Sequence, residues 1–155
     1  MGKEGFEALV GQITSAIAGK PLDAALATEL NARFPASSAA FKAIEAACHE
    51  AIAEGWMCSR EAGGIKFGRV AKPAPALARF SIDVVHMSNV KGPHHRHPNG
   101  EIDMIMPVTQ GARFDGHPAG WCVYGPGSAH HPTVTEGAAI VLYLLPDGAI
   151  EFTKA

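Results

Sequence analysis

The sequence predicts a mainly β domain, built as a sandwich or a barrel, that follows an N-terminal helical segment, so that the whole chain is α+β. Two observations predict this. Apolar residues recur at helical spacing through the first 55 positions. Beyond them, short apolar runs alternate with Gly and Pro, which is typical of short strands joined by turns. We therefore expect a helical segment over residues 1–55, packed on a β domain over residues 56–155.

Three helices are predicted in the first segment, each with a recognisable start or stop. The first ends at Gly19-Lys20-Pro21, and Asp23 can cap the second, which ends before Pro35. A serine of Ser37-Ser38 can cap the third, and Gly55 is a suitable C-terminal stop. Because each helix is apolar on one face only, we expect all three to pack against the β domain.

The β domain is punctuated by turn residues. The first two strands flank Ala62-Gly63-Gly64 as a hairpin, and the run at residues 138–145 is apolar throughout, so both of its faces should be covered. The predicted strands span residues 56–60, 65–70, 80–90, 102–108, 112–114, 121–124, 133–135, 138–145 and 149–152.

Composition excludes several classes of partner. The net charge of −2 offers no basic field for nucleic acid or an anionic membrane, so we expect neither as a partner. Cys48, Cys58 and Cys122 are odd in number and far apart, which favours free thiols in a reducing compartment. The N-terminus has no apolar signal-peptide run. We expect a cytoplasmic protein.

The most informative stretch runs from Gly92 to Glu101. His95 and His97 alternate with Arg96, so on a strand both imidazoles lie on one face. Asn99-Gly100 favours a tight turn that folds Glu101 back beside His97. Two imidazoles and a carboxylate are the ligands that a borderline divalent metal prefers.

A fourth ligand is available further along the chain. His130 and His131 follow a glycine turn, and seven of the eight histidines fall between His86 and His131. The two neighbours point to opposite faces of a strand, so a register shift would exchange them. From the residues alone, either could be the fourth ligand.

These spacings resemble those of the cupins. The first motif is H-x-H-x3-E, from His95 to Glu101, and the second combines G-x5-P with G-x2-H, from Gly120 to His130. The resemblance implies a cupin-type double-stranded β-helix barrel. It also implies that His95, His97, Glu101 and His130 bind one divalent metal ion at its mouth, with Zn, Fe, Mn and Ni all compatible.

A narrower resemblance covers nearly the whole chain. The blocks at residues 61–65, 67–70, 92–107 and 126–130 are similar to the 4-hydroxylaminobenzoate lyase family, small cupin-like proteins of nitroaromatic degradation. The resemblance implies a carbon–nitrogen lyase that converts 4-hydroxylaminobenzoate to 3,4-dihydroxybenzoate (protocatechuate) and releases ammonia. The partner would be a small aromatic carboxylate.

Such a reaction needs an acid, a base and a positioned water. Our catalytic candidates are Glu101, Asp103 and His131. Glu101 and Asp103 share one strand face, so both can point into the barrel. Asp103 is either a proton shuttle or a carboxylate that orients a histidine, and both readings stay open here.

Substrate-binding candidates follow from the expected aryl carboxylate, which favours a bidentate arginine. Arg69 and Arg113 lie on strand-like runs, whereas Arg96 should face away from the metal ligands. Tyr124 is a candidate for stacking on the ring. Met104 and Met106 form an apolar outer face, to be covered by the helices or by a second subunit. We expect a homo-oligomer, most simply a dimer.

Two other functions are compatible with the residues. An Fe-dependent cupin dioxygenase acting on an aromatic acid would use the same histidine and carboxylate ligands. A non-catalytic cupin that binds a metal or a small molecule would need no acid or base. Oxygen consumption identifies the first, and ligand affinity without turnover identifies the second.

Overall fold

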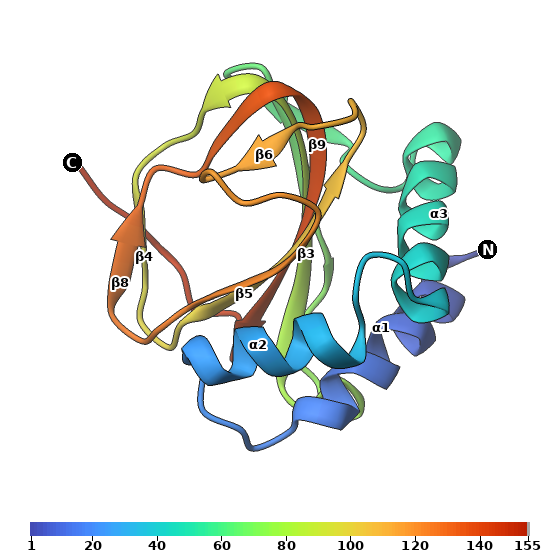
Figure 1. Cartoon of the computed structure of the whole chain (residues 1–155). Helices are drawn as coiled ribbons and strands as arrows, with labels where there is room; N and C mark the ends of the chain where they lie inside the picture. Colours follow the sequence, from blue (N-terminus) through green and yellow to red (C-terminus); the bar gives the residue numbers. More distant parts are fainter. Residues whose placement is uncertain (155) are drawn as a thin grey trace.

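The computed structural model describes residues 1–154, and its elements follow the predicted order of three helices and then strands (Figure 1). The predicted mainly β barrel with an N-terminal helical segment is confirmed. Within the described residues, no helix is long and apolar enough to cross a bilayer. The helices are α1 (Lys3–Ile17), α2 (Ala24–Arg33) and α3 (Ala39–Glu54), with a 3-10 turn η1 (Pro75–Leu77). The strands are β1 (Arg60–Ala62), β2 (Ile65–Ala71), β3 (Phe80–Lys91), β4 (His95–His97), β5 (Glu101–Pro107), β6 (Arg113–Phe114), β7 (Gly120–Tyr124), β8 (Ser128–His130), β9 (Thr133–Pro146) and β10 (Glu151–Phe152).

The predicted helix caps are confirmed. The Leu26 amide donates a hydrogen bond of 2.9 Å to the Asp23 carboxylate at the start of α2. At the start of α3 the cap is the second of the two candidate serines, Ser38. Gly55 ends α3 in the left-handed conformation, at φ 89°, where a side chain would be strained.

The strands form two antiparallel sheets that enclose the barrel. The larger sheet has the order β1-β2-β3-β9-β5-β7, with β6 also paired to β9, and the smaller has the order β10-β4-β8. In Figure 1 the smaller sheet lies on the side of the barrel opposite α1 and α3. Strands β4 and β8, which carry His95, His97 and His130, are therefore far from the two long helices.

Two strand predictions need correction. The runs predicted at 133–135 and 138–145 form one strand, β9, because Glu136 and Gly137 take positive φ (64° and 124°) and make a bend within it rather than an end. The first strand begins at Arg60 instead of residue 56, and Cys58, within the predicted run, interrupts the extended backbone with a φ of 55°. Strand β8 was not predicted at all.

The Asn-Gly turn forms, but its flanking strands do not make a hairpin. The Gly100 amide donates to the His97 carbonyl at 3.2 Å, which closes the turn. However, β4 pairs with β8 and β10, whereas β5 pairs with β7 and β9. The turn therefore carries the chain from one sheet to the other. Gly100 has φ 88°, and a Cβ there would lie 2.7 Å from the Tyr124 carbonyl oxygen, so only glycine fits.

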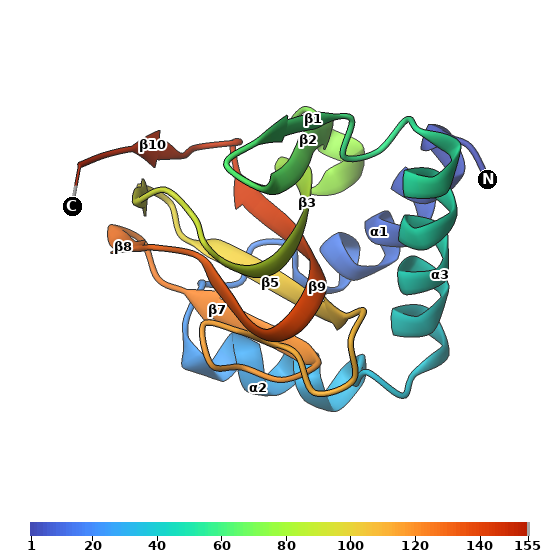
Figure 2. The ribbon, with the colours of Figure 1, turned by 90° about the horizontal axis from the view of Figure 1, so that it is seen from above.

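The helices cover the outer face of the larger sheet, as predicted for Met104 and Met106 (Figure 2). Both methionines belong to a core cluster that includes residues of all three helices. A polar contact also fixes α2 to the edge strand β7. The Asn31 side chain accepts from the Trp121 amide and donates to the Trp121 carbonyl, each at 2.9 Å. This satisfies backbone groups that an uncovered edge would leave unpaired.

Candidate metal centre

Four side chains converge inside the barrel: His95 and His97 from β4, Glu101 from the start of β5, and His130 from the end of β8. One ligand atom from each lies within 4.8 Å of all the others. Three of the four residues are buried, and His130 is half-buried. The structure thus brings together the four residues predicted as metal ligands.

Sheet register accounts for the convergence. His95 lies directly opposite His130 in the antiparallel β4–β8 pair, and His97 follows on the same face. The turn at Gly100 then returns the chain so that Glu101 lies beside His97. This register also selects His130 over its neighbour His131, a choice that the sequence left open.

The separations match the coordination sphere of one divalent ion. The Nε2 atom of His130 lies 3.0 Å from the Nε2 atoms of both His95 and His97. The nearer Glu101 oxygen is 3.3 Å from His97 Nε2 and 3.6 Å from His130 Nε2. Ligands about 2.0–2.2 Å from a shared ion, at angles between square and tetrahedral, are separated by roughly 2.9–3.6 Å.

Unsatisfied polar atoms support the same assignment. Glu101 has no solvent exposure, and neither of its carboxylate oxygens has a hydrogen-bond partner among the described residues. A buried carboxylate without a partner is costly unless it coordinates a metal or is protonated. The donor set, three imidazole nitrogens and one carboxylate, suits Zn, Fe, Mn or Ni. The residues present therefore fit a divalent metal.

Protonation equilibria favour ligand forms of two histidines. Burial, reinforced by the neighbouring imidazoles, lowers the pKa of His95 to about 4 and that of His97 to about 3. Both are neutral at pH 7 and can offer a free lone pair. Burial also acts to lower the pKa of His130, but the nearby Asp115 and Glu101 carboxylates outweigh it and raise that pKa to about 9. A metal ion would replace the positive charge that His130 otherwise carries.

Asp115 orients His130 and was missed by the sequence analysis. His130 Nδ1 lies 2.6 Å from Asp115 Oδ2, and the Tyr124 hydroxyl donates to the same oxygen at 2.5 Å. The Thr133 amide donates to the other oxygen at 2.8 Å. With Nδ1 turned to a carboxylate, Nε2 of His130 faces the cluster. Asp115 is a turn residue with a φ of 48°, and it belongs to no sequence motif that could have indicated this role.

Asp103 lies directly behind Glu101, as the strand parity predicted. It is fully buried, and the Cys122 thiol donates to its Oδ2 at 3.6 Å, whereas its Oδ1 has no partner within residues 1–154. Burial, together with the negative charge of Glu101, raises the pKa of Asp103 well above its usual range. The raised pKa favours the protonated, neutral form of Asp103.

The remaining predicted residues lie at different distances from the cluster. His131 points away from it, with Nδ1 3.1 Å from the Gly92 carbonyl oxygen and its ring against His94. Arg113 is exposed and donates to the Gly116 carbonyl at 3.0 Å. Tyr124 reaches the site through Asp115, and its ring stacks near His97. Their predicted catalytic and binding roles stay predictions.

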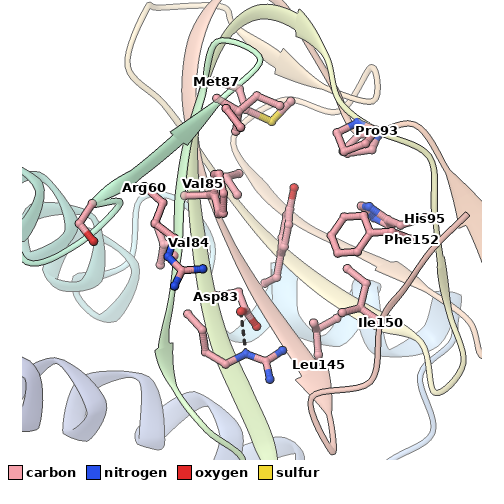
Figure 3. A pocket seen from close by; sticks show the side chains of 18 residues that line it. Arg60, Asp83, Val84, Val85, Met87, Pro93, His95, Leu145, Ile150 and Phe152 are labelled. Atoms are coloured by element: carbon pink, nitrogen blue, oxygen red, sulfur yellow. Dashed lines mark hydrogen bonds and ion pairs between the residues drawn. The ribbon is translucent and has the colours of Figure 1, made fainter.

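Arg69, the other predicted anchor, lines a cavity of about 590 Å³ that opens beside the cluster (Figure 3). His95 is in the wall of the same cavity. Most of the lining is apolar and comes from β2, β3, β9 and the C-terminal strand, and its polar members include Arg60, Asp83 and the Tyr143 hydroxyl. A cavity of this size and character suits a small aromatic ligand.

Comparison with known proteins identifies the family. The family model described as 4-hydroxylaminobenzoate lyase, PnbB, matches residues 8–152, which is nearly the whole chain. The chain belongs to the 4-hydroxylaminobenzoate lyase family. It is therefore a lyase, as the sequence predicted.

Curated members of the 4-hydroxylaminobenzoate lyase family agree with this assignment. The protein of that name from Nocardioides sp. (strain LMS-CY) is 35% identical, over 79% of this chain and 78% of the relative. The one from Pseudomonas putida is 31% identical, over 79% of this chain and 80% of the relative. Both alignments extend over most of each protein.

Solved structures similar to this lyase include a cupin protein from Ralstonia eutropha and a DMSP lyase from Ruegeria pomeroyi. The first is 15% identical, with a TM-score of 0.45 over 62% of this chain and 64% of the other. The second is 20% identical, with a TM-score of 0.40 over 97% of this chain and 96% of the other. Both similarities are low.

Proposed function

We propose that the protein converts 4-hydroxylaminobenzoate to 3,4-dihydroxybenzoate with release of ammonia. The observation that carries this proposal is the position of the His95–His97–Glu101–His130 cluster beside a mostly apolar cavity sized for a small aromatic acid, with His95 in the cavity wall. Membership of the lyase family supports the choice of substrate.

The proposed reaction is redox-neutral. The N–O bond breaks as the hydroxyl takes a proton and leaves as water, and a second water adds its oxygen to the neighbouring ring carbon. A third water hydrolyses the resulting imine and ammonia leaves, while loss of the ring proton restores aromaticity. Two waters enter and one leaves, so the net consumption is one water for each ammonia released. The site must therefore donate protons, accept protons and exclude bulk solvent.

The chain supplies these groups around one end of the cavity. Asp103 has a raised pKa that favours its protonated form, its Oδ1 has no partner among residues 1–154, and it shares a strand face with Glu101. Tyr143 lines the cavity, and burial raises its pKa well above the usual value, so its hydroxyl stays protonated and can donate to the leaving oxygen. A divalent metal held by His95, His97, Glu101 and His130 would supply Lewis-acid chemistry and make water more acidic.

The cavity wall would hold the aromatic ring. Phe67 and Val85 from neighbouring strands, together with Phe152 from β10, give the lining its apolar character. Phe152 meets the His95 ring edge-on, with 5.8 Å between ring centroids. A ring bound here would have its reacting end near His95 and its faces against apolar side chains.

The cellular setting is part of the same proposal. Cys48, Cys58 and Cys122 are all buried and unpaired, which supports a reducing, cytoplasmic compartment. A homodimer stays a prediction that sedimentation or light scattering would test.

Product stoichiometry tests the proposed function. Purified protein loaded with a divalent metal should convert 4-hydroxylaminobenzoate to equal amounts of 3,4-dihydroxybenzoate and ammonia, at the same rate with and without oxygen. Oxygen consumption in step with turnover would identify a dioxygenase instead. Binding of the aryl acid without any product would identify a non-catalytic module.

A further inference from the structure

The cavity next to the metal centre has two cationic side chains in its wall, Arg60 and Arg69. Figure 3 shows Arg60 and Asp83 on one side of the cavity, and His95 and Phe152 on the opposite side. A ligand that reaches His95 can therefore extend across the cavity towards the arginines.

The charge of Arg69 is already neutralised. Its Nε donates to Asp83 at 2.8 Å, and its Nη2 donates to the Gly148 carbonyl at 3.1 Å. Asp83, which also lines the cavity, would repel an incoming anion at this point. Arg69 is thus held in place by groups of the chain, and it offers little net positive charge to a ligand.

Within the part of the chain that the structure describes, Arg60, unlike Arg69, has neither a neutralising carboxylate nor a hydrogen bond that holds its side chain in place. No ion pair within residues 1–154 includes Arg60, and none of the side-chain hydrogen bonds in that part of the chain does. It lies on the exposed edge strand β1, where its Cα is paired with that of Phe67, an apolar residue of the cavity wall. A cation beside an apolar wall binds an anion more strongly than one surrounded by water.

We propose that Arg60 binds the carboxylate of the aromatic acid, while the para substituent on the opposite end of the ring reaches the cluster at His95. The proposal rests on the proposed function for the identity of that substituent, but the carboxylate contact can be tested without turnover. Arg60 would select aryl acids over neutral aromatics of the same shape, because only the acid gives its guanidinium a bidentate partner.

Binding of an unreactive acid tests the proposal directly. The dissociation constants of 4-aminobenzoate and of its neutral analogue 4-aminobenzamide would be measured by calorimetry on the metal-loaded protein. Arg60→Met should weaken 4-aminobenzoate binding by about 10–100-fold, the value of a charge-assisted hydrogen bond, and leave amide binding unchanged. Arg60→Lys should give an intermediate loss, because lysine keeps the positive charge but lacks the paired N–H donors of the guanidinium.

Lys66→Met is the matched control. Lys66 is an exposed cation on the same hairpin, and it does not line the cavity. Its replacement should change neither dissociation constant. The proposal is wrong if Arg60→Met binds the acid as tightly as the unmodified protein, if acid and amide weaken equally, or if only Arg69→Met weakens the acid.

The same variants separate this inference from the proposed function. If 4-aminobenzoate binds through Arg60 but no 3,4-dihydroxybenzoate is formed from the hydroxylamino acid, the proposed reaction is wrong and the carboxylate contact stands. If turnover occurs with an unchanged KM in Arg60→Met, the contact is wrong and the reaction stands.

Discussion

The Nδ1 atom of His130 lies 2.6 Å from the Oδ2 atom of Asp115, which joins a turn residue to the predicted metal ligands. Because Nδ1 faces a carboxylate, the other ring nitrogen, Nε2, is directed at His95 and His97. Asp115 thereby determines which nitrogen His130 can offer to a metal.

Replacing Asp115 with Asn should weaken metal binding by about 10–100-fold, because the neutral amide keeps the size of the side chain and removes its charge. Competition with a chelating dye measures the affinity. Tyr124→Phe is the matched control, since it removes a different hydrogen bond to the same oxygen and should cost much less. Equal metal affinity in Asp115→Asn and the unmodified protein would contradict the orienting role.

His97→Ala should abolish stoichiometric metal binding and leave the far-UV circular dichroism close to that of the unmodified protein. The variant removes one of three imidazoles directed at the centre. His94→Ala serves as the control, because His94 is only half-buried and its Nδ1 contacts Thr153 instead of the cluster. Metal analysis of the purified variants gives the answer, and a full complement of metal in His97→Ala would refute the assigned site.

Asp103→Asn distinguishes the two roles open to this buried acid. If Asp103 is a proton shuttle, the replacement should lower kcat by about 100-fold or more and leave the metal content unchanged, since general acid–base catalysis contributes on the order of 10²–10⁴-fold. If Asp103 orients a histidine, the replacement should weaken metal binding instead. Cys122→Ala, which removes the thiol that donates to Asp103, is the control for local packing. We expect the kinetic effect, and an unchanged kcat would exclude the shuttle.

Asn31→Ala should lower the free energy of unfolding by about 1–3 kcal/mol, because it leaves the amide and carbonyl of Trp121 without their partners. Urea denaturation measures the change. Thr28→Ala on the same helix is the comparison, since Thr28 bonds only the carbonyl of Ala24 within its own helix. Equal stability of the two variants would show that the helix is attached to the barrel by apolar packing alone.

Much of the fold could be predicted because its signals are local. Asp23, Ser38 and Gly55 each act within one turn of their own helix, so the sequence determines the helix ends directly. The single strand β9 was predicted as two because Glu136 and Gly137 look like a turn, and only pairing with β3 on both sides of the bend keeps the strand continuous.

The site divides in the same way. His95, His97 and Asp103 follow from the alternation of side chains along a strand, and the register of β4 against β8 decides the choice of His130 over His131. Asp115 and Arg60 carry no spacing signal. They gain their positions from long-range contacts, the first through a turn that approaches His130 and the second through a hairpin that flanks the cavity.

The central claim is that the lyase depends on one divalent ion held by His95, His97, Glu101 and His130. The most direct measurement is a titration of chelator-treated protein with one metal, following bound metal and the rate of ammonia release from 4-hydroxylaminobenzoate together. We predict no release without metal, a rate that rises in proportion to bound metal, and a plateau at one equivalent for each chain. Full activity in protein shown to be free of metal would contradict the account.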